Sequence, residues 1–356
     1  MRDTIIEMSK QFQGSKPRRV YAIGDVHGCA TELESLIAEL RIDRDTLVVF
    51  LGDYVDRGVD SRRVIDIVIG LGERCEVVPL MGNHEAMFLD FLERPESVGS
   101  GLFILNGGSS TLANYAGPSG AFDIPQAHIE FLKSLKPFHE TESHFFVHAG
   151  VPLKKKLRDL DPWLDREAFL WTRGPFLSTS HRWEKIIVHG HTPSEHPERR
   201  PNRINIDTGC VFGGNLTAYD VLEDRFISVP RIPFSEIAPP ILTDASKRIA
   251  VRFNGRMPVT AGRPGEKRTP FETLNYNQFG LLLRELPKME PSGFQPGDVI
   301  EGMIGDDHRT AVQFEGQIVR VEQRNGRALY GIKIDKVSSD GGGVEDSGGG
   351  WVSRPA

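Results

Sequence analysis

The sequence predicts an α/β domain followed by a small antiparallel β-barrel. Three observations support this prediction. Short β-branched runs alternate with helix-like segments over residues 19–230, the pattern of a sheet covered by helices. A proline-rich stretch interrupts that pattern at residues 231–246, because proline continues neither kind of element. Several short strand-like runs separated by turn residues then follow over residues 247–335, which is typical of a small barrel.

The first domain is predicted element by element from its apolar spacing. The runs "RVYAI", "TLVVFL" and "CEVVPLM" are typical of buried strands. Two segments between them have apolar residues at helical spacing: Leu33, Leu36, Ile37 and Leu40, then Val64, Ile67, Val68 and Leu71. Further strands are expected in "HFFVHAG", "KIIVHGH" and "RINIDTG", and a hairpin in "NLTAYDVLEDRFISV". The looser stretch from Pro95 to Pro137, which contains "NGGSST" and "YAGPSG", is predicted to form a cap over a site.

The second domain, residues 247–335, is predicted from short strand-like runs separated by turn signals. These runs are "RIAVRF", "GLLLREL", "DVIEGMI", "AVQFEGQIVRVEQ" and "ALYGIKI". Residues 1–18 are predicted as an N-terminal tail and residues 231–246 as a linker. Residues 336–356 are rich in glycine and serine, so we expect a flexible tail there.

Composition and charge exclude several classes of protein. The chain has 356 residues and a formal charge of -6, so nothing suggests general binding to nucleic acid or to an anionic membrane. It has no signal-peptide pattern and no apolar run of the ~18 residues that a membrane span needs. The prediction is a cytoplasmic protein. Cys29, Cys75 and Cys210 are odd in number and widely spaced, which argues against a disulfide framework or a thiolate zinc site.

Polar clusters of one kind follow the predicted strands of the first domain. They are, in order, "GDVHG", "GDYVDRG", "GNHE", "HAG", "HGH" and "DTG". Loops at the carboxyl ends of α/β strands share one rim, so these clusters can converge. Asp, His and Asn together suit Mn, Fe or Zn. One such cluster alone is more typical of a turn, but turns have no need of histidine, so the ordered series predicts a metal centre.

The order of these motifs resembles the metallophosphoesterase superfamily. The likeness is to bacterial phosphoprotein phosphatases related to the phage lambda phosphatase and to symmetrical diadenosine-tetraphosphate hydrolases, and it covers residues 19–230. The resemblance implies a calcineurin-like β-sandwich flanked by helices. It also implies two divalent metal ions, with manganese expected first and iron or zinc as alternatives.

The resemblance assigns the metal ligands. It implies that Asp25 and His27 hold one ion and that Asp53, the first aspartate of "GDYVDRG", bridges both. The second ion would be completed by Asn83 of "GNHE", His148 of "HAG" and His191 of "GHT". The nucleophile is then expected to be a metal-bridging hydroxide that attacks phosphorus directly.

Four further residues acquire catalytic roles from the resemblance. His84 of "GNHE" would be the general acid, and Asp56 would orient it and raise its pKa. Arg57 would bind phosphoryl oxygens, and Arg173 in "FLWTRGPF" would be a second phosphate-binding arginine. An exposed loop arginine is the alternative interpretation of Arg173.

Two more motif residues have open interpretations. His189 in "VHGH" competes with His191 as a ligand, although its place on the predicted strand disfavours it. Asp207 of "DTG" is either support for a histidine ligand or a plain turn aspartate. The histidines outside the motif series are expected to be structural or exposed: His128, His139, His144, His181 and His196.

The region from Arg248 to Ile334 resembles a PilZ domain, a small barrel known for binding cyclic di-GMP. The likeness rests on "LNYNQFGLLL", "FQPGDVI" and "GQIVRVEQRNGRALYGIKI", in the family's order. The family binds its ligand through an R-x-x-x-R segment and a D-x-S-x-x-G turn. Here the turn retains Gly280 but has Asn275 and Asn277 in place of Asp and Ser.

The arginine segment also departs from the PilZ pattern. Arg248, Arg252 and Arg256 give two pairs of the right spacing. If Arg248 is aligned as the second arginine of the motif, however, Asp244 falls where the first should be, and an aspartate repels phosphate. Packing or binding of a protein partner is therefore favoured over cyclic di-GMP sensing.

The favoured function is a serine/threonine protein phosphatase, because Arg57 and Arg173 suit a phosphomonoester. Its partners would be phosphorylated proteins or small phosphoesters. The alternative with the same chemistry is a symmetrical bis(5'-nucleosyl)-tetraphosphatase or related nucleotide hydrolase. A catalytically inactive scaffold or PilZ-type signalling module belongs to another class. A third possibility is a phosphatase tuned by a ligand or partner of its PilZ-like domain.

Overall fold

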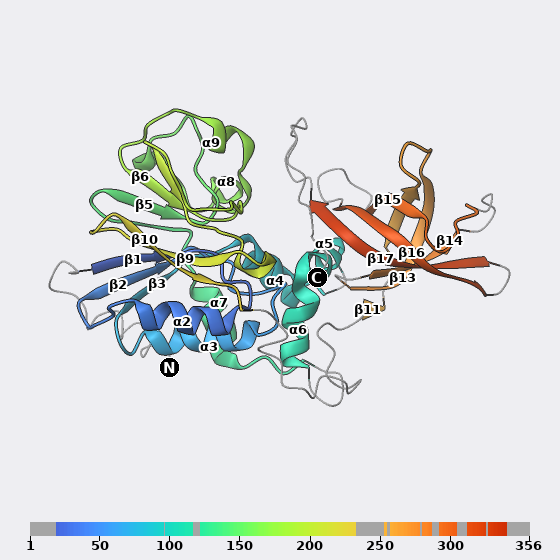
Figure 1. Cartoon of the computed structure of the whole chain (residues 1–356), viewed down its shortest axis with the longest axis horizontal. Helices are drawn as coiled ribbons and strands as arrows, with labels where there is room; N and C mark the ends of the chain where they lie inside the picture. The colour runs from blue at the N-terminus through green and yellow to red at the C-terminus, as the bar shows by residue number, and fades with distance from the viewer. Residues whose placement is uncertain are drawn as a thin grey trace.

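A computed structural model of the whole chain shows an α/β domain followed by a β-barrel (Figure 1). The structure describes residues 19–95, 97–116, 122–232, 253–254, 257–277, 280–286, 292–304, 312–324 and 327–339. The predicted tail at residues 1–18 and nearly all of the linker lie outside these ranges. So do Asp244, Arg248, Arg252 and Arg256, on which the comparison with the PilZ arginine motif depends.

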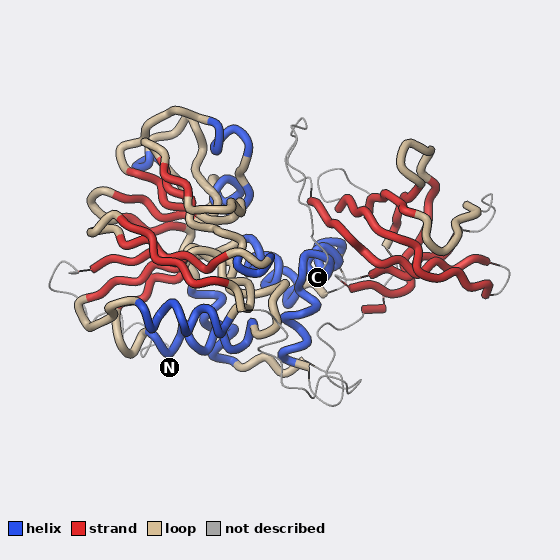
Figure 2. Tube along the Cα trace, in the orientation of Figure 1, coloured by secondary structure: helices blue, strands red, loops and turns tan. Residues whose placement is uncertain are grey.

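The first sheet of the α/β domain has the strand order β10-β9-β1-β2-β3. Its parallel strands are β1 (Arg19–Ile23), β2 (Thr46–Phe50) and β3 (Glu76–Pro79). The hairpin of β9 (Asn215–Asp220) and β10 (Arg225–Pro230) joins β1 in the antiparallel sense. Both predicted helices are present, as α2 (Ala30–Glu39) and α3 (Ser61–Leu71), and they cover one face of this sheet (Figure 2).

The second sheet has the order β4-β5-β6-β8-β7. Its strands are β4 (Phe138–Glu140), β5 (His144–Val147), β6 (Ile186–His189), β7 (Glu198–Arg199) and β8 (Arg203–Asn205). The short helices α8 (Arg166–Trp171) and α9 (Gly174–Ser178) lie over its outer side, where Phe169 and Phe176 pack against Phe145 and Ile187. Two 3-10 turns, η2 (Leu157–Asp159) and η3 (Cys210–Phe212), complete this part of the chain.

The two sheets stack face to face because their strands alternate between two cores. Val20 and Ala22 of β1 belong to a buried cluster with Val188 of β6 and Ile204 of β8. The intervening Tyr21 and Ile23 belong to the core beneath the helices. This alternation is the period of two that places neighbouring strand residues on opposite faces. The predicted β-sandwich flanked by helices is confirmed.

The segment predicted as a cap is largely helical. After α4 (Asn83–Glu93) come α5 (Val98–Phe103), the π-helical turn η1 (Ile104–Gly108) and α6 (Ser109–Tyr115), followed by α7 (Gln126–Ser134). Phe103 stacks on Phe88 of α4 with a ring-centroid distance of 5.2 Å. The glycine and serine content suggested a loose segment, but aromatic packing stabilises short helices there.

The second domain is a closed antiparallel barrel. Its strands are β11 (Phe253–Asn254), β12 (Pro258–Gly262), β13 (Thr269–Asn277), β14 (Gly280–Glu285), β15 (Val299–Ile304), β16 (Val312–Arg324) and β17 (Arg327–Ser339). The order is β11-β13-β12-β15-β16-β17-β14, and β13 also pairs with β14, which closes the barrel. The sequence analysis missed β12 and β13. β12 begins with Pro258, and β13 has Pro270 as its second residue; proline is tolerated near the start of a strand, where its missing N–H matters least.

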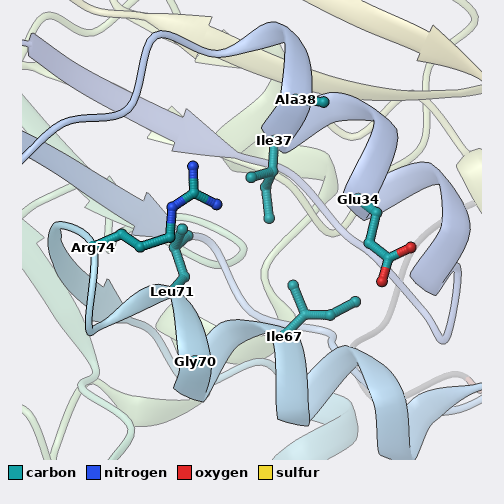
Figure 3. Close-up of a pocket in the computed structure, with 7 residues that line it drawn as sticks. All are labelled: Glu34, Ile37, Ala38, Ile67, Gly70, Leu71 and Arg74. Carbon is teal, nitrogen blue, oxygen red and sulfur yellow. The ribbon is translucent and has the colours of Figure 1, made fainter.

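A cavity of about 410 Å³ opens between α2 and α3 (Figure 3). Ile37, Ala38, Ile67 and Leu71 line it, with Arg74 at one end. None of the predicted site residues lines this cavity. Among the described residues, no helix is both long and apolar enough to cross a membrane.

Candidate metal centre

The motif loops meet at the carboxyl ends of the strands. The backbone N–H of His27 donates to the carbonyl oxygen of Asp53 at 2.8 Å. The backbone N–H of His191 donates to the Asp25 carboxylate at 3.1 Å, although the two residues are 166 positions apart. Residues from both sheets are thus brought together, as the shared rim predicts.

The backbone at this rim is unusual. Among the described residues, six that are not glycine have positive φ, and five of them are predicted site residues: His27, Asp53, Asp56, Arg57 and His191. A positive φ is sterically unfavourable for these residues because their Cβ approaches the backbone. Strained backbone of this kind persists only where the surrounding structure holds it, and it is concentrated at functional sites.

Asp53 lies between two groups of candidate ligands. Its Oδ2 is 3.4 Å from His27 Nε2 and 3.9 Å from His84 Nε2. Its Oδ1 is 3.5 Å from His148 Nε2, and His191 completes that second group. One carboxylate therefore presents a separate oxygen to each group, which is the geometry that a bridging ligand needs.

One histidine of each group is fixed in the form that binds metal ions. His27 Nδ1 donates to the Val55 carbonyl at 2.8 Å, and His148 Nδ1 donates to the Leu51 carbonyl at 2.9 Å. Each ring therefore keeps the Nε2 lone pair for a ligand. Burial lowers the pKa of His27 well below its ordinary value and that of His148 to about 3, so both rings are neutral.

Lone pairs converge where the second ion would lie. Asn83 Oδ1 is 2.9 Å from His148 Nε2 and 3.0 Å from His191 Nδ1. With its proton on Nδ1, His148 cannot donate to that oxygen, so two acceptors face each other. Two acceptors repel each other at this distance unless a cation lies between them. The residues here therefore fit a metal ion.

Buried carboxylates add negative charge to the site. Burial raises the pKa of Asp53 to about 7 and that of Asp207 to about 6. Burial, followed by the charges of Asp207 and Asp53, raises the pKa of Asp25 well above its ordinary value. Crowded carboxylates of this kind are stabilised by a bound cation. The other predicted histidine and aspartate ligands belong to the two groups that share Asp53, but Asp25 belongs to neither group.

His84 is paired with Asp56 through its other ring nitrogen. His84 Nδ1 lies 2.7 Å from Asp56 Oδ2, and both side chains are buried. The expectation that Asp56 raises the pKa of His84 is wrong for this structure. Burial, followed by the charge of Arg57, lowers the pKa of His84 well below its ordinary value.

Both predicted phosphate-binding arginines reach the candidate ligands. Arg57 Nη1 donates to His27 Nε2 at 2.5 Å, and Arg173 Nε donates to His191 Nε2 at 3.1 Å. Arg173 is exposed as a whole residue, yet its guanidinium contacts the site. That contact favours a binding role over a loop arginine turned to solvent.

His189 and Asp207, the two motif residues with open interpretations, lie in different surroundings. His189 lies on β6, and its Nε2 faces the buried Arg203 at 3.4 Å rather than the candidate ligands. Asp207 accepts the backbone N–H of Gly209 at 3.0 Å, as a turn aspartate does. It is also close enough to Asp25 to raise that residue's pKa.

Glu85 is a site residue that the sequence analysis missed, although it ends the quoted "GNHE" motif. Its Oε1 accepts the backbone N–H groups of Tyr54 and Val55 at 2.8 and 3.1 Å. Its Oε2 accepts those of Asp53 and Gly82 at 2.9 and 3.1 Å. One buried carboxylate thus joins the loops that carry Asp53 and Asn83.

The Glu85→Gln variant is expected to be less stable and to bind metal ions more weakly. In either orientation the glutamine amide turns its NH₂ group toward two N–H donors, which are then left unsatisfied. Two such donors cost about 2–4 kcal/mol in the free energy of unfolding. Urea unfolding and metal content measure both effects, and Glu34→Gln, which changes a half-exposed helix residue, is the control. An unchanged unfolding midpoint would contradict the bridging role of Glu85.

Known proteins are similar to this chain over its first domain. The family model described as calcineurin-like phosphoesterase matches residues 18–226. A serine/threonine-protein phosphatase 1 of Salmonella typhimurium is 31% identical over 220 residues, which are 59% of this chain and 95% of that protein. An asymmetrical bis(5'-nucleosyl)-tetraphosphatase PrpE of Oceanobacillus iheyensis is 32% identical over 240 residues, covering 61% of this chain and 94% of that one.

Solved structures are similar to parts of this chain. A cold-active protein-tyrosine phosphatase of Shewanella is 19% identical with a TM-score of 0.43, covering 62% of this chain and 81% of that one. The PilZ domain of YcgR from Escherichia coli is 11% identical with a TM-score of 0.21, covering 24% of this chain and 75% of that one. Since the calcineurin-like model matches more than half of the sequence, the chain belongs to the calcineurin-like phosphoesterase family.

Proposed function

We propose that the protein is a dinuclear-metal phosphoesterase that hydrolyses phosphoserine and phosphothreonine in proteins. The observation that carries the proposal is the position of Asp53, whose two oxygens face separate histidine groups. Asp25 and His27 would hold one ion with Asp53, and Asn83, His148 and His191 would hold the other. Ions bound there would activate water for attack on phosphorus and neutralise phosphoryl oxygens.

The remaining residues would act on the substrate itself. Arg57 and Arg173 approach the site from opposite histidine groups, so their N–H groups would hold phosphoryl oxygens from two sides. His84 would donate a proton from Nε2 to the leaving oxygen, while its Nδ1 stays bonded to Asp56. Glu85 would keep the Asp53 loop in place.

A nucleotide hydrolase is the second candidate, and one feature favours it. Phe212 is 60% exposed, and the Arg57 guanidinium lies over its ring at 5.4 Å from the centroid. An exposed aromatic face beside a phosphate-binding arginine could stack on a nucleobase. The tetraphosphatase relative is named asymmetrical, whereas the sequence analysis proposed symmetrical cleavage.

A direct rate comparison tests the two functions. The manganese-loaded protein is expected to have a kcat/KM on a phosphoserine peptide at least about 10-fold above that on diadenosine tetraphosphate, a difference of about 1.4 kcal/mol in transition-state binding. The Phe212→Ala variant is the matched probe, because it removes the aromatic face but no phosphate contact. A preference for the dinucleotide that Phe212→Ala abolishes would overturn the phosphoprotein assignment, and inactivity on both substrates would overturn the enzyme.

A further inference from the structure

The segment formed by α5, η1 and α6 touches the catalytic loop on one side and the barrel on the other. In Figure 1 it lies between the two domains. It carries no residue that the sequence analysis assigned to catalysis. Its contacts on both sides are close and buried, so the two domains are connected through it.

The first contact is between η1 and Arg57. The backbone N–H of Arg57 donates to the Gly107 carbonyl at 3.2 Å. Gly107 has a φ of 116°, and a Cβ at this position would lie 2.6 Å from Arg57 N and 2.7 Å from Arg57 Cγ. Only glycine permits this approach. The position of η1 therefore constrains the backbone of Arg57.

The second contact is between α6 and Asp56. Thr111 Oγ1 donates to Asp56 Oδ1 at 2.6 Å and accepts the backbone N–H of Asp56 at 2.8 Å. This leaves Asp56 Oδ2 for His84. Both Thr111 and Asp56 are fully buried, so water cannot replace a lost bond. One turn further along α6, Asn114 Nδ2 donates to the Val59 carbonyl at 2.8 Å.

The barrel contacts the other side of this segment. Gly101 of α5 faces Met257, and a Cβ at Gly101 would collide with the Met257 Sδ. Met257 is buried, and its backbone exchanges hydrogen bonds with Thr273 of β13, at 2.9 and 3.0 Å. Strand β13 also lies against η1. Phe103 and Ile104 share one apolar cluster with Met257.

We propose that Thr111 is a positioning residue for Asp56, and that the barrel sets the rate of hydrolysis by holding the α5–η1–α6 segment through Met257. A shift of the segment would move the Thr111 hydroxyl away from Asp56 and the Gly107 carbonyl away from Arg57. Asp53 lies earlier in the same loop, where Glu85 accepts its backbone N–H, and the other candidate metal ligands lie on other loops, so the ligands would stay in place. This inference rests on the proposed function of His84 as general acid, which Asp56 orients.

Variants of Thr111 test the first step in the full-length, manganese-loaded protein. Thr111→Val keeps the shape but removes the hydroxyl, so kcat on phenyl phosphate is expected to fall about 10–100-fold, as when a supporting hydrogen bond is lost. The loss on nitrophenyl phosphate should be much smaller, because that leaving group scarcely needs an acid. Thr111→Ser should restore the rate on phenyl phosphate. Equal losses on both substrates, or no rescue by serine, would overturn the positioning role.

Variants of the barrel contact test the second step. Met257→Ala removes the side chain from the barrel side, and Gly101→Ala disturbs the same contact from α5, where alanine favours the helix. Each is expected to lower kcat on phenyl phosphate about threefold or more, with metal content and nitrophenyl phosphate turnover nearly unchanged. Met303→Ala, at a partly exposed position of β15, is the matched control.

The outcomes separate this inference from the proposed function. If the wild type hydrolyses phosphoesters and both Met257→Ala and Gly101→Ala retain its rate on phenyl phosphate, the link to the barrel is overturned. If Met257→Ala does not fold, Gly101→Ala alone decides. If the wild type hydrolyses neither substrate, the proposed function is overturned, and this inference, which rests on it, is overturned as well.

Discussion

The Asp53→Asn variant is expected to lose metal ions and to lower kcat by a factor on the order of 10³ or more, the range lost when a central charge-stabilising group is removed. Asp53 Oδ2 faces His27 and Oδ1 faces His148. Asparagine keeps one oxygen but turns an NH₂ group toward the other histidine group, and nitrogen in an amide does not bind divalent ions. At most one ion would keep its full ligand set.

Metal analysis of the dialysed protein, together with phosphatase assays over a range of manganese concentrations, measures this loss. Asp159→Asn changes an exposed carboxylate outside the site and should leave both quantities unchanged. An Asp53→Asn protein that retains two ions per chain would contradict the bridging role, even if its rate were low. Full activity of the Asp53→Asn protein at a high manganese concentration would show that Asp53 contributes to metal affinity and not to the rate of hydrolysis.

The sequence could predict which side chains meet at the rim because each motif follows a strand. A strand followed by Gly-Asp, Gly-Asn or His-Ala-Gly has its polar residue at the sheet rim whatever the details of packing. The structure accordingly brings His27, Asp53 and His148 together from loops that are far apart in the sequence. Topology and local spacing were sufficient for this part of the site.

The sequence could not predict contacts that depend on how separate elements pack. Thr111 lies in a segment that its composition marked as loose, and its bonds to Asp56 exist only because α6 packs beside that loop. Glu85 was visible in a motif, but its four N–H partners come from two loops. The pKa of His84 was predicted from its partner alone, whereas burial decides its direction.

The positive φ angles around the site explain why its loops depend on such support. Asp56 and Arg57 have φ values of 75° and 66°, which are unfavourable for residues with a Cβ. Glu85, Gly107 and Thr111 supply hydrogen bonds to this loop from three directions. Under the proposed function, metal binding would need the first part of the loop, which carries Asp53, and proton transfer would need the second part, which carries Asp56. These two functions should therefore be separable by mutation.

The second large effect is expected for His84→Asn and depends on the leaving group. His84 Nε2 lies 3.9 Å from Asp53 Oδ2, beside the site, and its Nδ1 is bonded to Asp56. Loss of a general acid costs about 10²–10⁴-fold, so a phosphoserine peptide should show a loss in this range. Nitrophenyl phosphate should show a far smaller loss, because its leaving group departs as a stable anion.

The Asp56→Asn variant completes this test, because it leaves the His84 ring in place. Asparagine replaces the carboxyl group that is bonded to His84 Nδ1, so the same dependence on the leaving group is expected with metal content unchanged. Because His84 also belongs to the group around Asp53 Oδ2, metal analysis of His84→Asn distinguishes an acid from a ligand. Loss of an ion together with equal losses on both substrates would make His84 a ligand and would refute its role as the proton donor.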